Sequence, residues 1–194
     1  MQVSSFGILT FRPDARTERA DWTWREVKIS IRKFERSDIP KKVEWINNPE
    51  NNQFLHYDIP ICVEKTEKWF DSHQGEDSRY DAVIEADGVP VGTIGLLSID
   101  RKNSKAEYYI AMGETAYKGK GVAKEASRLI LKYGFEELGL NRIYLFTEVE
   151  NVAAQKLFER VGFVREGVVR QDIMSHGKYV DRIAYGFLRE DWNR

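Results

Sequence analysis

The sequence is poor in cysteine and has no long run of apolar residues. Its one cysteine, Cys62, cannot form a disulfide within the chain. No window approaches the roughly 18 apolar residues of a membrane-spanning helix, and the amino-terminal residues do not resemble a cleavable signal segment. We therefore expect a cytoplasmic protein with no membrane partner, in which Cys62 is a buried structural thiol rather than a nucleophile.

Histidine is also scarce, and neither sign of charge dominates. The 3 histidines, His56, His73 and His176, lie far apart without the spacing of paired metal ligands, so we expect no metal site. The 30 lysines and arginines against 31 aspartates and glutamates leave a net charge of -1. This balance gives no broad basic field, and we expect no nucleic-acid partner.

Length and composition predict one domain preceded by a short extension. The chain has 194 residues, of which 42% are hydrophobic, enough for a substantial core. Residues 1–21 mix a strand-like segment with a polar, charged one, so they are an N-terminal extension of uncertain structure. The single domain then spans residues 22–194.

The first half of this domain contains both helix and strand patterns. Alternating apolar residues indicate a strand within residues 22–34, and helical spacing indicates two helices, the first capped by Ser37. A polar loop rich in asparagine separates the two helices. Residues 80–112 predict three strands of an antiparallel meander, because the Asp87-Gly88 pair is typical of a tight hairpin.

The second half repeats a strand–helix pattern. After the meander come a glycine-containing loop, Tyr117–Ala126 (YKGKGVAKEA), and a helix with one apolar face. A buried strand at residues 142–149 precedes a second helix, which Asn151 caps and Gly162 ends. Two further strands complete the chain.

The loop Tyr117–Ala126 has the composition of an anion-binding site. Gly119 and Gly121 let the backbone approach a ligand, and the first turn of the following helix offers unpaired N–H donors at the positive end of its dipole. This combination favours a phosphate, with Lys118 and Lys120 as cations beside it. A turn that needs glycine only for its dihedral angles is the alternative.

Two nucleotide-binding motifs share parts of this loop but not its spacing. A dinucleotide fingerprint, G-x-G-x-x-G, would follow the strand directly and would use Glu148, at the end of the next strand, for the ribose. Here Gly121 is followed by Val122, Ala123 and Lys124. A P-loop would need Gly-Lys-Ser/Thr, which is absent. Neither motif explains the loop.

A different family fits the order of the elements. The segments KGKGVA (118–123) and RIYLFTEVENVAAQKLFERVGFVREG (142–167) resemble the GNAT superfamily of acyl-coenzyme A N-acyltransferases, and the resemblance covers about residues 29–192. The segment WINNPE (45–50) and residues 162–188 are similar to the ribosomal-protein N-terminal acetyltransferase branch. The resemblance implies an α+β, sandwich-like GNAT fold: a mixed central sheet of about six to seven strands, antiparallel in its first half and flanked by about four helices.

The resemblance also implies acetyl-CoA as cosubstrate. In the family, amides of the glycine loop hold the pyrophosphate, and the preceding strand pairs with the pantetheine arm and polarises the thioester carbonyl. Lys118 stands where the family usually has Gln or Arg, and Phe158 stands where many members carry a tyrosine that acts as general acid. The residues expected to bind acetyl-CoA are Ile110, Ala111, Met112, Lys118, Gly119, Lys120, Gly121, Val122, Ala123, Asn151 and Phe158.

An amine acceptor would need a base. An alkyl amine with a pKa near 10.4 is mostly protonated at pH 7, and freeing its lone pair costs roughly 4 to 5 kcal/mol. The resemblance places the base on the strand before the loop, where Glu107 is the only carboxylate, and burial beside Tyr108 and Tyr109 would raise its pKa. An exposed glutamate paired with Lys105 or Arg101 is the alternative.

The acceptor itself is left open by the sequence. We expect it to attack acetyl-CoA directly, with no acyl-enzyme, and to be a protein N-terminus or a small amine. Alternatives are a nucleotide amino sugar, a non-catalytic coenzyme A-binding sensor and a nicotinamide enzyme, and a homodimer is possible. The residues expected near the acceptor are Trp45, Asn47, Asn48, His56 and Asp58.

Overall fold

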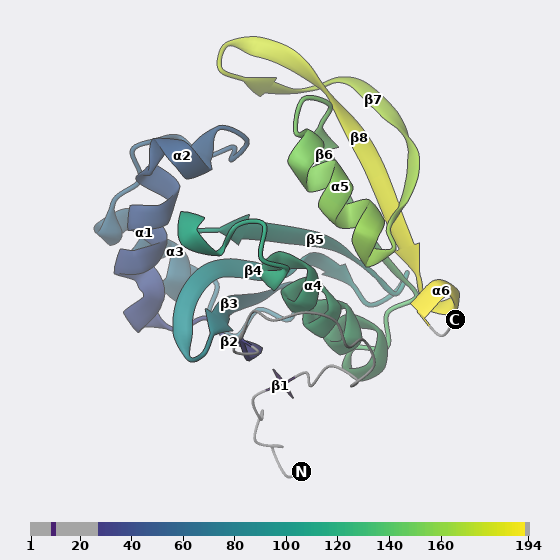
Figure 1. The fold of residues 1–194 in the computed structure, drawn as a ribbon, viewed down its shortest axis with the longest axis horizontal. Coiled ribbons are helices and arrows are strands. Elements are labelled where there is room, and N and C mark those ends of the chain that lie inside the picture. The colour runs from purple at the N-terminus through teal and green to yellow at the C-terminus, as the bar shows by residue number, and fades with distance from the viewer. Residues whose placement is uncertain (1–8, 11–26, 193–194) are drawn as a thin grey trace, which may run out of the picture.

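A computed structural model describes residues 9–10 and 27–192 (Figure 1). The expected mixed sheet is confirmed, with eight strands in the order β1-β2-β3-β4-β5-β6-β8-β7. All neighbouring pairs are antiparallel except β5 and β6, which are parallel. The strands are β1 (Leu9–Thr10), β2 (Ile29–Lys33), β3 (Tyr80–Ala86), β4 (Val89–Asp100), β5 (Lys105–Met112), β6 (Arg142–Glu148), β7 (Val164–Ser175) and β8 (Lys178–Leu188).

Four helices of nine or more residues, α1, α3, α4 and α5, match the expected number among the described residues. Short turns accompany them, and α4 continues directly into the π-helical turn η3. No helix in the described ranges is long and apolar enough to cross a membrane. The helices are η1 (Arg36–Asp38), α1 (Ile39–Asn47), α2 (Pro49–Asn52), α3 (Val63–Ser72), η2 (Thr115–Tyr117), α4 (Val122–Lys132), η3 (Tyr133–Glu137), α5 (Val152–Val161) and α6 (Arg189–Trp192).

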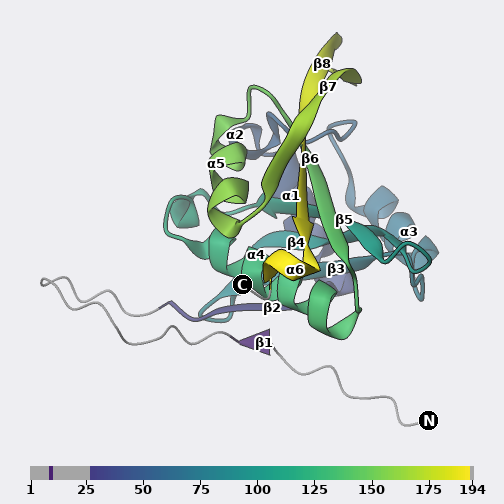
Figure 2. The same cartoon turned by 90° about the vertical axis from the view of Figure 1, so that its right-hand side faces the viewer.

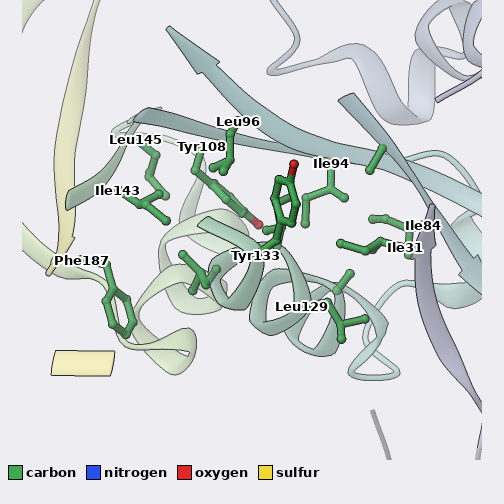
Figure 3. Close-up of a cluster of buried hydrophobic side chains, with 14 of the residues drawn as sticks. Ile31, Ile84, Ile94, Leu96, Tyr108, Leu129, Tyr133, Ile143, Leu145 and Phe187 are labelled. Carbon is green, nitrogen blue, oxygen red and sulfur yellow. The ribbon is translucent and has the colours of Figure 1, made fainter. Parts of the chain in front are cut away.

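The sheet separates two apolar clusters, because alternate residues of a strand face opposite sides. On β3, Ala82 and Ile84 belong to the larger cluster, which α4 covers with Leu129 and its neighbours (Figure 3). Val83, between them in sequence, packs on the other side with Phe34 and with α1. The sheet is therefore covered on both faces, and any ligand site must lie where this packing is interrupted.

Three local expectations need correction. Ser37 does not cap α1, because it lies inside η1, where the Asp38 carboxylate accepts the N–H of Glu35 at 2.8 Å. The asparagine-rich loop contains the one-turn helix α2, capped by Asn48. Cys62 is not fully buried: it immediately precedes α3 and is partly exposed.

The described part of the predicted extension pairs with the sheet, whereas the last two strands project beyond the helices. The short strand β1 lies within the predicted extension, and the remaining residues of 1–21 lie outside the described residues. At the other end, β7 and β8 form a long hairpin that projects beyond the helices (Figure 2). At the tip of this hairpin, Ser175 Oγ donates a hydrogen bond to Glu148 at the end of β6.

Candidate active site

The site begins where β5 and β6 separate. Their parallel pairing ends at Glu107, whereas β4 continues to pair with β5 as far as Met112. Gly113 donates its N–H to the Val91 carbonyl at 2.9 Å. Because bonded positions alternate along an antiparallel strand, the N–H groups of Ile110 and Met112 point away from β4, into the gap. This gap therefore presents free backbone donors.

A cleft with a volume of about 1150 Å³ lies at this gap and is lined by residues from both faces of the sheet. We call its two ends the loop half and the aromatic half, and Glu107 also lines the cleft. The loop half is lined by Ile110–Met112, by α5, and by Tyr117, Lys118, Gly119, Gly121, Ala123 and Lys124 of the glycine loop and the start of α4. The aromatic half is lined by Lys42, Tyr57, Trp69, Arg79, Asp81 and Tyr109.

The glycine loop has the geometry that an anion needs. Gly119 and Gly121 have φ angles of 76° and 82°, and no atom lies within 4 Å of a Cβ added to either. Helix α4 starts directly after Gly121, and no side chain caps it. Its first N–H groups are therefore available to a ligand, and the cations of Lys118 and Lys124 line the same end of the cleft.

Most of the residues expected to bind acetyl-CoA are brought together here. Lys118 donates to the Glu50 carbonyl at 3.1 Å and to Asn51 Oδ1 at 2.8 Å, so it ties the loop to α2. Two side chains lie elsewhere: Lys120 is exposed beside the Tyr117 ring, and Val122 is buried in the core. The expected residues that line the cleft are Ile110, Ala111, Met112, Lys118, Gly119, Gly121, Ala123, Asn151 and Phe158.

Asn151 and Phe158 both have structural roles. Asn151 Oδ1 accepts the Ala154 N–H at 3.2 Å, which confirms the predicted cap of α5. Phe158 is 6% exposed, and its ring centroid lies 5.9 Å from that of Tyr108 and 6.0 Å from that of Tyr185. Phe158 is thus a packing residue at the wall of the cleft.

The hydroxyl of Tyr108 is already engaged. It lies 2.7 Å from Ser127 Oγ, and Ser127 donates its own proton to the Ala123 carbonyl at 2.6 Å. Tyr108 must therefore be the donor to Ser127. Burial raises the pKa of Tyr108 well above its ordinary value. The hydroxyl proton of Tyr108 is therefore engaged in the hydrogen bond to Ser127 of α4.

Among the carboxylates of the cleft, Asp81 and Glu148 are hydrogen-bonded and Asp58 is exposed, whereas Glu107 is neither bonded nor fully exposed. It is partly buried at the last residue of the β5–β6 pairing and makes no hydrogen bond or ion pair with any described residue. Pairing with Lys105 or Arg101 is not observed. Burial raises the pKa of Glu107, and the positive charge of Arg182 opposes that rise without reversing it. Glu107 is therefore a free carboxylate with an increased affinity for a proton.

A second carboxylate, Glu148, was considered from sequence only as a ribose ligand. It is buried, and its Oε1 lies 2.8 Å from His56 Nε2 and accepts a hydrogen bond from Ser175 Oγ at 3.2 Å. This cluster joins the segment after α2, the end of β6 and the tip of the β7–β8 hairpin. No sequence pattern links residues so far apart.

The residues expected near the acceptor divide into two groups. His56 and Asp58 line the cleft. Trp45, Asn47 and Asn48 instead hold neighbouring segments in place through hydrogen bonds. Their partners are Glu114 for Trp45, the backbone of Ile61 for Asn47 and the Glu50 N–H for Asn48. Across the described ranges, no group of three His, Cys, Asp or Glu side chains could hold a metal ion.

Comparison with known proteins gives consistent matches. The family model described as "Acetyltransferase (GNAT) domain" matches residues 28–164. The SPbeta prophage-derived uncharacterized N-acetyltransferase YokL of Bacillus subtilis (strain 168) is 32% identical over 142 residues, 73% of this chain and 78% of that protein. The putative ribosomal N-acetyltransferase YdaF of the same organism is 37% identical over 108 residues, 55% of this chain and 57% of that protein.

The fold is also similar to a solved structure. Spermidine N-acetyltransferase from Vibrio cholerae, in complex with CoA and spermine, superposes with a TM-score of 0.80 at 26% identity, over 86% of this chain and 98% of that chain.

Proposed function

Because the chain belongs to the acetyltransferase (GNAT) family, we propose that it moves an acetyl group from acetyl-CoA to a small primary amine by direct attack in a ternary complex. The family and the relatives identify an acetyl-CoA-dependent N-acetyltransferase. The observation that carries the proposed mechanism is Glu107, an unpaired, partly buried carboxylate where β5 and β6 separate.

The loop half fits the acetyl-CoA substrate. Free N–H groups at the start of α4, together with Gly119 and Gly121, suit its pyrophosphate. The unpaired N–H groups of Ile110 and Met112 suit the polar pantetheine arm and the thioester oxygen. Acetyl-CoA supplies the activated acyl group, and the chain positions it.

Glu107 would act as general base. Its carboxylate takes the proton that blocks the lone pair of the bound ammonium ion. The nitrogen then attacks the thioester carbon, the C–N bond forms, the C–S bond breaks and the electron pair leaves on sulfur. The remaining excess proton of the nitrogen passes through solvent to the thiolate, which gives an amide and free coenzyme A.

No protein acid is required for the leaving group. Phe158 cannot donate a proton, and the Tyr108 hydroxyl donates to Ser127. The leaving thiol of coenzyme A resembles the thiol of cysteine, which has a pKa of about 8.5. Its departure as a thiolate at pH 7 is therefore uphill by only about 2 kcal/mol. The neutral wall around Phe158 is compatible with this route.

A small amine is the acceptor class we favour. Spermidine N-acetyltransferase, with a similar fold, acts on a small amine, and this supports the assignment. The ribosomal branch, for which YdaF is a partial match, remains a prediction, and a protein N-terminus is the second candidate. The homodimer also stays a prediction, which sedimentation can test.

The base assignment can be tested with two isosteric variants. Glu107→Gln should lower kcat by about 10² to 10⁴ at pH 7, and the deficit should shrink as pH rises and the amine deprotonates itself. Glu148→Gln is the matched control: it removes a carboxylate of the same cleft that is already bonded to His56 and Ser175, and its kcat should fall by less than about tenfold. Equal losses in both variants would contradict the assignment of Glu107.

A binding measurement that needs no turnover can test whether the chain binds acetyl-CoA or NAD. Acetyl-CoA should raise the melting temperature, whereas NAD should not, because only a ligand of the native state stabilises it. Stabilisation by NAD alone would reject the proposed function. Free-thiol release with a panel of amines then measures the reaction directly.

A further inference from the structure

The far end of the aromatic half contains a lysine without an anionic partner. Lys42 lines the cleft, and its Nζ lies 3.8 Å from the ring centroid of Trp69 and 5.3 Å from that of Phe34. Lys42 forms no hydrogen bond or ion pair with any residue in the described ranges. Its Nζ lies against aromatic faces and not in a hydrogen bond, which leaves its N–H donors available to a ligand.

The adjacent carboxylate, Asp81, is already neutralised. Arg79 donates to both of its oxygens, at 2.6 and 3.0 Å, and the Tyr109 hydroxyl donates to it at 2.7 Å. Arg79 also lies 4.7 Å from the Trp69 ring centroid. Around Trp69, two cations, Lys42 and Arg79, therefore face one carboxylate, Asp81.

A glycine makes this arrangement possible. Gly95 of β4 pairs with both Tyr109 and Asp81, and a Cβ on Gly95 would lie 2.6 Å from the Tyr109 ring. The absence of a side chain lets the Tyr109 ring cross β4 and reach Asp81 on β3. The hydroxyl thereby fixes Asp81 beside Arg79.

We infer that the amine acceptor carries an anionic group, a phosphate or a carboxylate, that binds Lys42 at this end of the cleft. The inference rests on the proposed function, which places the amine at Glu107. Lys42 and Glu107 both line this one cleft, so a single acceptor molecule can contact both. A polyamine would instead place its second cation beside Lys42 and Arg79, where like charges repel.

The ionisation of Lys42 agrees with this arrangement. Burial lowers the pKa of Lys42 to about 8; the charge of Asp81 opposes the shift, and Arg79 adds to it. Most of the lysine is still protonated at pH 7. An acceptor anion would supply a hydrogen-bonded counter-charge, which no described residue gives to Lys42.

Matched acceptor pairs test the inference by free-thiol release. One pair is glucosamine 6-phosphate and glucosamine; the other is a dipeptide and its C-terminal amide; spermidine is the cationic comparison. The acidic member of at least one pair should have a kcat/KM about tenfold or more above its neutral counterpart and above spermidine. The pair that shows the advantage distinguishes phosphate from carboxylate.

Three variants test whether Lys42 causes the preference for the acidic acceptor. Lys42→Met keeps the apolar stem over Trp69 without the charge and should reduce the advantage to about twofold or less, chiefly through KM. Lys42→Arg should retain most of the advantage. Lys33→Met, which removes an exposed lysine of β2 that does not line the cleft, should retain all of it.

The opposite results are equally clear. A preference for spermidine or the neutral amines, or an advantage that persists in Lys42→Met, would overturn the inference. If no amine releases thiol, the proposed function fails, and calorimetry of the same pairs with coenzyme A present decides the inference separately. Binding of an acidic member that is lost in Lys42→Met supports it, and absence of such binding contradicts it.

Discussion

The two halves of the cleft are built in different ways. The loop half presents mostly backbone donors from one short stretch, Ile110–Ala123, at the start of a helix. The aromatic half presents side chains from α1, α3, β3 and β5, and most of their polar groups are already bonded to one another. A shared substrate such as acetyl-CoA can be held by backbone, whereas choice of the acceptor depends on side chains assembled from distant parts of the chain.

The neighbouring residues Tyr108 and Tyr109 show the same contrast on one strand. Tyr108 faces α4 and bonds to Ser127, whereas Tyr109 faces the opposite side and bonds to Asp81. Successive side chains of a strand alternate between faces, so two identical residues serve different halves. Substitutions on either side of β5 should therefore affect different substrates.

The largest effect on acetyl-CoA binding is expected from Gly121→Val. A branched side chain at φ 82° would strain the loop and block approach of the pyrophosphate, so acetyl-CoA affinity should fall by more than about 100-fold. Gly75→Val is the control, because Gly75 has φ 81° and equally open surroundings but does not line the cleft. Calorimetry should show near wild-type affinity for the control. Equal losses in the two variants would mean that strain, not ligand approach, is responsible.

A smaller change is expected from Phe158→Tyr, which adds a hydroxyl to the wall of the loop half. If that hydroxyl protonates the leaving sulfur, kcat rises by at most about 30-fold, the equivalent of about 2 kcal/mol. Phe163→Tyr adds a hydroxyl to the same aromatic cluster away from the cleft and should leave kcat unchanged. A loss beyond tenfold in Phe158→Tyr with unchanged melting temperature would show that an apolar residue is required there.

Tyr109→Phe and Tyr108→Phe compare the two halves directly. Each variant removes one hydroxyl hydrogen bond and should lower the free energy of unfolding by about 1 kcal/mol. Tyr109→Phe should raise KM for the acceptor and leave the acetyl-CoA dissociation constant unchanged, since its hydroxyl positions Asp81. Tyr108→Phe should leave the acceptor KM unchanged. The two Michaelis constants and urea unfolding test both statements, and a reversed pattern would contradict the division of the cleft.

The smallest expected effect is on stability. Burial raises the pKa of Glu107, so the folded state favours the protonated acid; that contribution is complete below the unfolded pKa and is lost as pH rises through the folded pKa. Glu107→Gln is neutral throughout and should melt slightly above wild type at pH 7, with the difference vanishing toward pH 4. Thermal unfolding from pH 4 to 8 measures this. A variant less stable than wild type at pH 7 would indicate a structural partner for the carboxylate.

Patterns within short segments were sufficient for most of the fold. The Asp87-Gly88 turn, the cap at Asn151 and the apolar face of α4 depend on neighbours a few residues apart, and all three are observed. Ser37 was misplaced because a preceding turn, with Asp38 as its acceptor, competes for the same helix start. Such competition between adjacent capping residues cannot be resolved from propensity alone.

The sequence by itself indicated the class of the enzyme through its resemblance to the GNAT superfamily. It also predicted the loop half of the candidate site, because glycines, lysines and a helix start lie together in one continuous stretch. Glu107 could be named as a candidate, but only the tertiary structure left it without a partner where β5 and β6 separate. The His56–Glu148 contact joins residues 92 apart, and the stack of Lys42 on Trp69 joins two helices. Contacts of this kind arise from packing around the whole sheet, and no local pattern in the chain specifies them.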